Sequence, residues 1–448
     1  MGLRSALEER VVGVVREARD ELVALVSELV ACDTTARDPG EPPREEERLQ
    51  RILERRLRAS GAETELWEPA PIGAGHPYVA AELDFVGRPQ LVARLLGSGG
   101  GRSLLLNGHI DAVATGAHEL WSGDPFRAEV RGGKLYGRGS CDMKGGVTTL
   151  AFAVEALRRA GVRLRGDIVF CSNTDEESSG VGGWAAVQHG VAADAGICAE
   201  PTGFDVYAAC RGTSTGVLTV PGRAGHAEMP QPHWRAGGAV NAIEAALPLI
   251  GSLRRLRDDW RTRPDQRHAL LSPSSITPTI IRAGEWSVTY PDSCAITCDL
   301  DYLPAGVDEA GTGRPAHQEV EDWVRAVAAA DPWLVAHPPS WKWIDDCPPA
   351  EVPVDHGIVV GALEAAGDLG RDGRITGLDS WHDAATYTLL GGTPTISFGP
   401  GQLLVAHSVD EYVPVDDLVD HAAAVALLLM RWCGVASPAG GRESTPAG

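Results

Sequence analysis

Basic residues are scarce in this sequence, which has 40 lysines and arginines against 61 aspartates and glutamates and a formal net charge of −21. Nucleic acids and anionic membranes attract basic patches, so this balance argues against both as partners. No apolar run approaches the roughly 20 residues of a membrane-spanning helix, and the charged opening MGLRSALEERVV lacks the apolar core of a signal peptide. The nine cysteines include no C-x-x-C pair. Free thiols in a reducing cytoplasm are therefore expected.

The 448 residues are enough for two domains. In residues 1–208 and 347–448, short apolar runs alternate with helical periodicity. This pattern predicts an α/β catalytic domain with a central, mostly parallel sheet flanked by helices. Residues 209–346 follow the order β-α-β-β-α-β, a ferredoxin-like α+β arrangement that we interpret as an inserted domain. Apolar spacing predicts helix within residues 7–31, and residues 435–448 have too little apolar content to fold and are expected to be disordered.

Six acidic and histidine residues are candidates for one metal site, because each lies in, or just past, a short apolar run that predicts a strand. The carboxyl ends of strands in a doubly wound sheet are where ligands bind. A mixture of imidazole and carboxylate groups, with no cysteine among them, suits a catalytic Zn²⁺ site. The candidates are His109, Asp142, Glu176, Glu177, Glu200 and His407.

Each of these residues also has an ordinary structural explanation. Asp142 could cap the helix that follows it, the acids of TDEESSG could form a solvated loop, and His407 could be a structural histidine. Jointly the ordinary explanations are weaker, because adjacent carboxylates repel unless cations or solvent neutralise them. Asp111 lies two residues after His109 in an extended segment, so it could fix the tautomer of that imidazole.

The motifs that carry these residues occur in a fixed order over nearly the whole chain: NGHIDAV, WSGDPF, LYGRGSCDMKGG, TDEESSG, AEPTG, GRAGHAEMP, GGAVNAI, and FGPG followed by AHSVDEYV. In these motifs the chain resembles the co-catalytic zinc amidohydrolases and exopeptidases. That family includes acetylornithine deacetylase, succinyl-diaminopimelate desuccinylase, aminoacylase and glutamate carboxypeptidase. The resemblance implies an aminopeptidase-like catalytic domain, and an inserted domain that acts as a lid and as the interface of a homodimer.

The resemblance also implies two divalent cations, Zn²⁺ first, with Co²⁺ or Mn²⁺ as alternatives. The peptide bond between Asp142 and Met143 is expected to be cis, as is common in the family. Asp142 would bridge the two ions, and a hydroxide shared by them would attack the amide. The implied ligands are His109, Asp142 and Glu200 for one ion and Asp142, Glu177 and His407 for the other.

Three further residues receive catalytic roles from the resemblance. Glu176 would be the general base, and Asp111 would orient His109. His226, in GRAGHAEMP, would reach an active site from the lid, often across the dimer, and stabilise the oxyanion. A core or surface histidine is the alternative explanation for His226.

The sequence departs from the family pattern where many members bind a substrate carboxylate through an Asn and an Arg. Here Val288 and Asp301 stand at those positions. An anion in place of a bidentate cation should repel a carboxylate. Either another arginine serves, with Arg211 and Arg282 as candidates, or the substrate has no free α-carboxylate. His382, in SWHDAATY, is a further candidate contact to substrate, with a packed loop histidine as the alternative.

These observations predict a metal-dependent hydrolase that cleaves the amide bond of a small N-acylated amine or amino acid. Dipeptidase or carboxypeptidase activity is the alternative within the same class. A non-catalytic binding protein on this scaffold would be expected to have lost ligands or the base, whereas this chain retains all of them.

Overall fold

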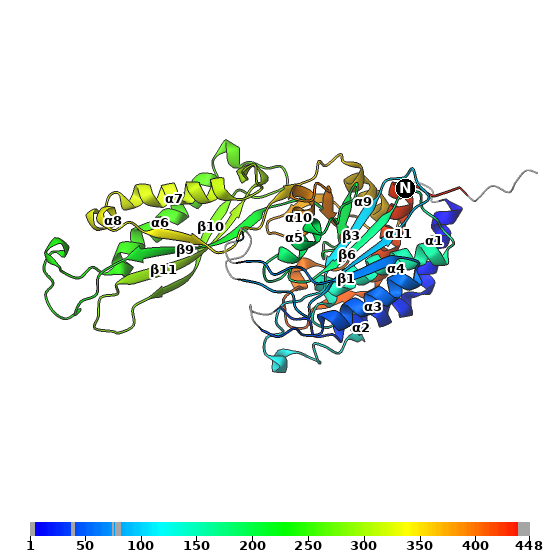
Figure 1. Ribbon diagram of the computed structural model, residues 1–448, viewed down its shortest axis with the longest axis horizontal. Coiled ribbons are helices and arrows are strands. Elements are labelled where there is room, and N and C mark those ends of the chain that lie inside the picture. The colour runs from blue at the N-terminus through cyan, green and yellow to red at the C-terminus, as the bar shows by residue number, and fades with distance from the viewer. Residues whose placement is uncertain (1–4, 37–40, 74–75, 77–81, 438–448) are drawn as a thin grey trace, which may run out of the picture.

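The computed structural model describes residues 5–36, 41–73, 76 and 82–437. The molecule is elongated, and each end is built around its own sheet (Figure 1). A nine-stranded sheet takes its strands from residues 63–210 and 350–397, and a four-stranded sheet lies within residues 212–343. A small third sheet contains β4 (Glu129–Arg131), β5 (Lys134–Tyr136) and β16 (Tyr412–Pro414). In the part of the chain that is described, no helix is both long and apolar enough to span a bilayer.

The nine-stranded sheet is parallel at its centre, as predicted, and mostly antiparallel toward its edges. Its order is β1-β2-β6-β3-β7-β15-β8-β13, and β14 also pairs with β8. β3 runs parallel to β6 and β7, and β7 runs parallel to β15. The carboxyl ends of these four neighbours therefore lie along one edge. The strands are β1 (Glu63–Trp67), β2 (Gln90–Leu95), β3 (Leu104–His109), β6 (Ile168–Asn173), β7 (Gly196–Cys198), β8 (Val206–Cys210), β13 (Ala350–Glu351), β14 (Ile375–Leu378) and β15 (Thr395–Ser397).

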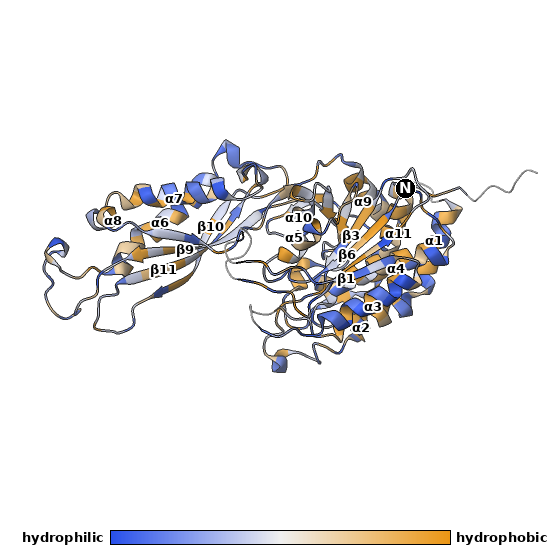
Figure 2. Ribbon diagram, viewed as in Figure 1, coloured by the Kyte–Doolittle hydropathy of each residue, from blue (hydrophilic) through white to orange (hydrophobic). Residues whose placement is uncertain are grey.

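Helices cover both faces of this sheet because its central strands are apolar on both sides. Leu104 and Leu106 of β3 pack in the main core, whereas Leu105 between them packs on the opposite face. Figure 2 shows these strands as largely hydrophobic. The main-core side carries α1 (Ala6–Glu17), α2 (Arg19–Val30), α3 (Glu46–Ala59), α4 (Gly145–Arg159), α9 (Gly357–Gly367) and α11 (Val415–Cys433), and the other side carries α5 (Val181–Gln188) and α10 (Ala384–Leu389).

The helical stretch predicted within residues 7–31 consists of two helices instead of one. Ala18 leaves the helical region, with φ −94° and ψ 19°, and separates α1 from α2. The spacing of apolar residues does not reveal this break, because both helices bury their apolar residues in the same core.

The four-stranded sheet has the predicted β-α-β-β-α-β order of elements. All its strand pairs are antiparallel, in the order β10-β11-β9-β12. Its apolar core shares no residue with the main core of the large sheet, which supports our interpretation of an inserted domain. The elements are β9 (Gly212–Pro221), α6 (Ala242–Trp260), β10 (Ser275–Ala283), β11 (Ser293–Tyr302), α7 (Arg314–Ala328), α8 (Pro332–Ala336) and β12 (Ser340–Trp343), on the left in Figure 1.

The chain passes from the large sheet to the four-stranded sheet after Cys210 and returns to the large sheet at Ala350. The proposed boundary between residues 208 and 209 falls inside β8, which pairs within the large sheet up to Cys210. On the return, Cys347 forms a bridge with Thr213 next to the outgoing strand. Of the tail expected to be disordered, Val435 pairs with Leu164, so this part is ordered. Residues 438–448 lie outside the described residues.

Candidate metal centre and active site

All six residues predicted to form the metal site meet at one edge of the large sheet. His109 is the last residue of β3, Glu176 and Glu177 follow β6, and Glu200 follows β7. The segment after β15 passes through a short 3-10 turn, Leu403–Val405, to His407. Asp142 lies just before α4, and its peptide bond to Met143 is cis, as the family resemblance implies. Because these strands are parallel neighbours, their ends carry residues distant in sequence to one place.

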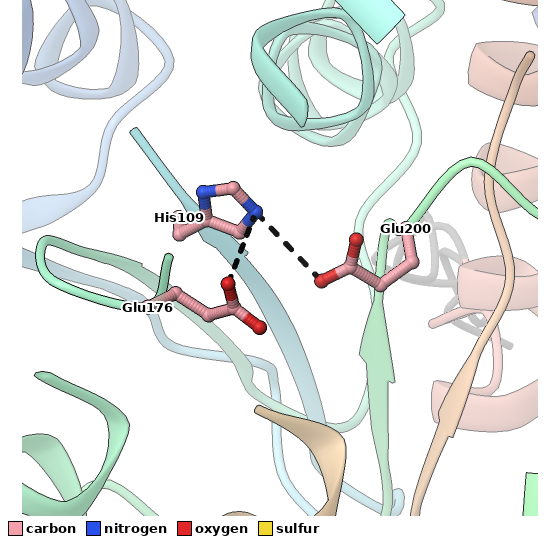
Figure 3. Close-up of side chains that lie close together, drawn as sticks. All are labelled: His109, Glu176 and Glu200. Atoms are coloured by element: carbon pink, nitrogen blue, oxygen red, sulfur yellow. Dashed lines mark ion pairs between the residues drawn. The ribbon is translucent and has the colours of Figure 1, made fainter. Parts of the chain in front are cut away.

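The imidazole of His109 faces three carboxylates. Its Nε2 lies 3.2 Å from Asp142 Oδ1. The same nitrogen lies 3.9 Å from both Glu176 Oε2 and Glu200 Oε1, as Figure 3 shows. Its Nδ1 lies 3.0 Å from the backbone carbonyl of Asp111. A carbonyl oxygen only accepts, so Nδ1 carries the hydrogen. In the neutral ring, Nε2 is then left with a lone pair directed at the carboxylates.

Asp142 lies between two imidazoles and offers one oxygen to each. Its Oδ2 is 3.4 Å from Nε2 of His407, and that nitrogen is 3.2 Å from Glu177 Oε2. His109 occupies the other side, at Oδ1. A carboxylate placed in this way can bridge two cations.

The donor groups fit divalent cations. Two sets lie with their ligand atoms within 4.8 Å of one another, namely His109 with Glu176 and Glu200, and His109 with Asp142 and Glu177. These sets pair the residues differently from the ligand sets that the resemblance implies, since His109 belongs to both of them. Glu177 Oε1 is buried and has no hydrogen-bond partner, which leaves an oxygen free to bind an ion.

The pKa values of the glutamates in this site are raised because their carboxyl groups lie away from solvent and close to other carboxylates. Burial, reinforced by the charge of Glu200, raises the pKa of Glu176 well above its usual range, although His109 opposes the shift. Burial, with the charge of Asp142, raises the pKa of Glu200 to about 8. Hydrogen bonds to Asp142 and Glu177 raise the pKa of His407 to about 10. A bound cation would favour the ionised form of these carboxylates and would displace the protons that the imidazoles hold.

Asp111 contacts both halves of the site. Its backbone carbonyl orients His109, and its carboxylate accepts the backbone N–H groups of Glu176 and Glu177 at 3.2 and 3.0 Å. The carboxylate itself is 3.6 Å from His109 Nδ1. Asp111 therefore holds the turn that carries both glutamates, in addition to fixing the imidazole.

Glu411 and Arg138 support Asp142 and were missed by the sequence analysis. Glu411 Oε1 accepts the backbone N–H groups of Cys141 and Asp142 at 2.9 and 3.0 Å. Its other oxygen is 2.5 Å from Nη1 of Arg138, and both side chains are almost fully buried. Both residues lie in recognised motifs, AHSVDEYV and LYGRGSCDMKGG. Their place in these motifs is the one feature of the sequence that could have pointed to them.

A second buried ion pair supports the turn before Glu176. Asp175 has a positive φ of 69° and accepts hydrogen bonds from Ser178 and Ser179. Arg88 Nη2 lies 3.0 Å from Asp175, and Arg88 also contacts Glu46 of α3 at 3.3 Å. Of the three consecutive acids, Asp175 is therefore fully engaged, and Glu176 and Glu177 are left to face the site.

A cavity of about 250 Å³ opens onto the metal site. His382, the candidate contact to substrate, lines this cavity, is 4% exposed, and has Nδ1 3.1 Å from Ser397 Oγ. Burial lowers the pKa of His382 to about 4, so this ring is neutral near pH 7. No lysine or arginine lines the cavity, among the described residues. Its other lining residues are Asp142, Glu176, Glu177, Glu200, Pro201, Tyr207, Leu378, Ser380, Trp381, Leu403, Ala406 and His407.

This cavity is not lined by His226, the candidate oxyanion residue, or by Arg211 and Arg282, the other candidate substrate residues. His226 is exposed on the four-stranded unit, where it bridges to Thr289, and Arg282 is exposed on β10. Arg211 is buried and lies 3.3 Å from Asp301. The anion at position 301 therefore compensates the charge of the arginine that was a candidate carboxylate binder.

Hydrolysis of an amide by divalent cations needs metal ligands on a rigid frame and a proton acceptor beside them. The strand ends and Glu176 provide both, which places the chain among the metal-dependent hydrolases. Residues 105–431 match peptidase family M20/M25/M40. The chain belongs to this family, which confirms the resemblance found in its motifs.

Several relatives match over most of their length. The N-formyl-4-amino-5-aminomethyl-2-methylpyrimidine deformylase of Halalkalibacterium halodurans is 29% identical over 440 residues, which cover 95% of this chain and 97% of that protein. The succinyl-diaminopimelate desuccinylase of Gluconacetobacter diazotrophicus is 30% identical over 370 residues, 77% of this chain and 85% of that protein. The crystal structure of aminopeptidase PepT from Bacillus cereus has a TM-score of 0.67 at 18% identity, covering 92% of this chain and 98% of its own, and so shares the fold.

Proposed function

We propose that this protein hydrolyses the amide bond of a small N-acylated amine that carries no free carboxylate. The observation that carries the proposal is the position of Glu176, whose side chain is 11% exposed and whose Oε2 lies 3.9 Å from His109 Nε2 within a cluster of candidate metal-binding groups. A carboxylate with a raised pKa in that position is suited to accept a proton and return it.

Two divalent ions would be held by His109, Asp142, Glu177, Glu200 and His407, with Asp142 between them. When bound, they would polarise the amide carbonyl and make water a nucleophile at neutral pH. Zn²⁺ is our first choice because of the mixed imidazole and carboxylate donors, with Co²⁺ or Mn²⁺ as alternatives.

The protein groups would divide the remaining tasks. Glu176 takes a proton from the attacking water and later gives it to the nitrogen of the leaving amine. Asp111 keeps Glu176 in place through the backbone N–H of that residue, at 3.2 Å. The neutral His382 lies in the cavity wall and can hydrogen-bond to the substrate without adding charge.

The preference for a carboxylate-free substrate rests on the charges around the cavity. Its described lining contains four carboxylates and no lysine or arginine, and Asp301 lies 3.3 Å from the nearby Arg211. Tyr207 and Trp381 offer aromatic surface to a flat amine. The name of the deformylase relative describes a formylated aminomethylpyrimidine, a compound with no carboxylate. A formyl or acetyl amide of an aromatic methylamine fits these features.

A substrate panel on metal-loaded protein tests this proposal. We expect kcat/KM for N-formyl and N-acetyl benzylamine to exceed that for N-acetyl amino acids by about tenfold or more, since a carboxylate would enter an acidic cavity without a cationic partner (1.4 kcal/mol corresponds to tenfold). N-succinyl amines and dipeptides complete the panel. Fast turnover of N-acetyl amino acids, unaffected by Arg211→Ala and Arg282→Ala, would refute the preference. Preferential cleavage of dipeptides would favour the alternative peptidase activity.

We further propose a homodimer formed through the four-stranded unit, with His226 completing the active site of the partner copy. His226 is exposed there, close to the exposed Met229 and Trp286, which are 59% and 71% accessible. The nine cysteines, all buried free thiols, fit a reducing compartment such as the cytoplasm.

Mixing two inactive variants tests the dimer. His226→Ala should lower kcat by about 10²–10³ through loss of an oxyanion donor, and Glu176→Gln removes the base. If His226 acts across the dimer, a mixed dimer has one complete site, so an equimolar mixture recovers roughly a quarter of wild-type activity by statistical assortment. A mixture that stays inactive although mixed dimers form would rule out the contribution from the partner.

A further inference from the structure

Arg211 joins several segments around the substrate cavity without lining it. It lies at the junction of β8 and β9 and is 8% exposed. Its backbone N–H donates to the carbonyl of Leu378 at 3.2 Å, so the junction is attached to the end of β14. Leu378 is also the first residue of a segment, 378–382, that supplies four residues to the cavity wall.

The guanidinium is engaged by two backbone carbonyls and by two carboxylates, one of which is Asp379 with Oδ1 3.7 Å from Nε. Nε and Nη2 donate to the carbonyl of Asp379 at 3.2 and 2.5 Å, and Nη1 donates to the carbonyl of Pro273 at 3.1 Å. Nη2 also lies 3.3 Å from Asp301 Oδ2 on β11. The planar fork of an arginine can reach several acceptors at once, which the single ammonium of a lysine cannot reproduce.

Ser272 also holds Asp379 in place, through two hydrogen bonds to its carboxylate. The backbone N–H of Ser272 donates to Asp379 Oδ1 at 2.8 Å, and its hydroxyl donates to Oδ2 at 2.5 Å. Ser272 and Pro273 precede β10 of the four-stranded unit. The wall segment is therefore attached to the four-stranded unit through Arg211 and Ser272 together.

We propose that Arg211 is a positioning residue for substrate specificity: it fixes residues 378–382 as the wall that holds the non-reacting part of the substrate, and Asp301 compensates its charge there. This inference rests on the proposed amide hydrolysis. Because a formyl group is a single carbon, the non-reacting part of such a substrate is its amine. Arg211 then determines how well a large amine binds, without touching the reacting atoms.

The test compares Arg211→Met with the wild type on two formamides, N-formylmethylamine and N-formylbenzylamine. KM for the benzyl substrate should rise about tenfold with kcat changed less than about twofold, which is how a loss of uniform binding appears. Kinetics on the methyl substrate and the metal content should stay unchanged. Amide hydrogen exchange across residues 376–383 should become faster, a readout that needs no activity.

Arg431→Met is the matched control. Arg431 also bridges distant segments, with contacts to Glu8 at 2.8 Å and Asp368 at 2.7 Å, but it does not line the cavity or contact its wall. Its loss should leave KM and exchange in residues 376–383 unchanged. Ser272→Ala removes one hydrogen bond from Asp379 and should shift both readouts in the same direction as Arg211→Met, by less. This milder variant keeps the test decisive if Arg211→Met does not fold.

Two outcomes would overturn the inference. One is unchanged exchange across residues 376–383 in both Arg211→Met and Ser272→Ala. The other is an equal fall of kcat for both formamides, which would assign Arg211 a general structural role. If the wild type hydrolyses no amide, the proposed function fails, whereas the exchange comparison still reports whether Arg211 holds the wall.

Discussion

Glu176→Gln is expected to retain two equivalents of bound metal while kcat falls by about 10²–10⁴, the range that a positioned general base contributes. The amide of glutamine has nearly the volume of the carboxylate but cannot take a proton from water near neutral pH. The backbone N–H of residue 176 would still donate to Asp111, so the turn should keep its shape. Metal analysis and steady-state kinetics on the same preparation measure both quantities.

Glu129→Gln is the control for that substitution, because Glu129 is exposed on β4 and does not line the cavity. It should change neither the metal content nor kcat. Loss of one metal equivalent in Glu176→Gln would mean that Glu176 is a ligand, as its place in one of the two candidate ligand sets allows. Activity within tenfold of the wild type would remove Glu176 as the base.

Removing the metals should abolish activity and lower the melting temperature. A ligand that binds only the native state stabilises it by about 2.7 kcal/mol when its free concentration is a hundred times its Kd. The carboxylates of Asp142, Glu177 and Glu200 would lose the cations that offset their mutual repulsion. Chelation followed by thermal unfolding measures this loss, and adding back Zn²⁺, Co²⁺ or Mn²⁺ singly identifies the ion that restores turnover.

The stabilisation by metal should grow with pH between about 5 and 8. In the metal-free protein, Glu200 and His407 have folded-state pKa values raised to about 8 and about 10. A raised folded pKa gives stability that is present below the unfolded pKa and is lost as pH rises through the folded value. Bound cations replace those protons, so the metal-dependent rise in melting temperature should be larger at pH 8 than at pH 5.5. Asp142→Asn should reduce this rise, and a pH-independent rise would contradict the argument.

The clustering of the candidate metal ligands was predictable from sequence because most of them lie where strands end. His109, Glu177 and Glu200 follow apolar runs that become parallel neighbours, and topology then brings them together without further information. The ligand sets were less accessible to sequence reasoning, since His109 alone contacts carboxylates from three different segments.

The features that could not be predicted from the sequence depend on contacts between distant segments. Such contacts leave no periodic pattern in the sequence. Arg211 was predicted as a candidate for binding a carboxylate, yet its donors reach the carbonyls of Asp379 and Pro273. Glu411 lies in a recognised motif, but its hydrogen bonds to the backbone of Cys141 and Asp142 depend on the packing of β16 beside the turn before α4. Likewise, His226 is exposed and does not line the cavity, so the oxyanion role that the resemblance implies stays a prediction.

The alternation of faces along β3 limits which changes in chain length this protein can accept. Leu104 and Leu106 pack on one face and Leu105 on the other, and His109 ends the same strand. A single-residue insertion within β3 would exchange the two faces and turn His109 away from its carboxylates. An insertion in the turn at Gly132 and Gly133, between β4 and β5, would not exchange the faces of a strand in this way. Insertions should therefore accumulate in such turns during divergence, while the spacing from Leu104 to His109 stays fixed.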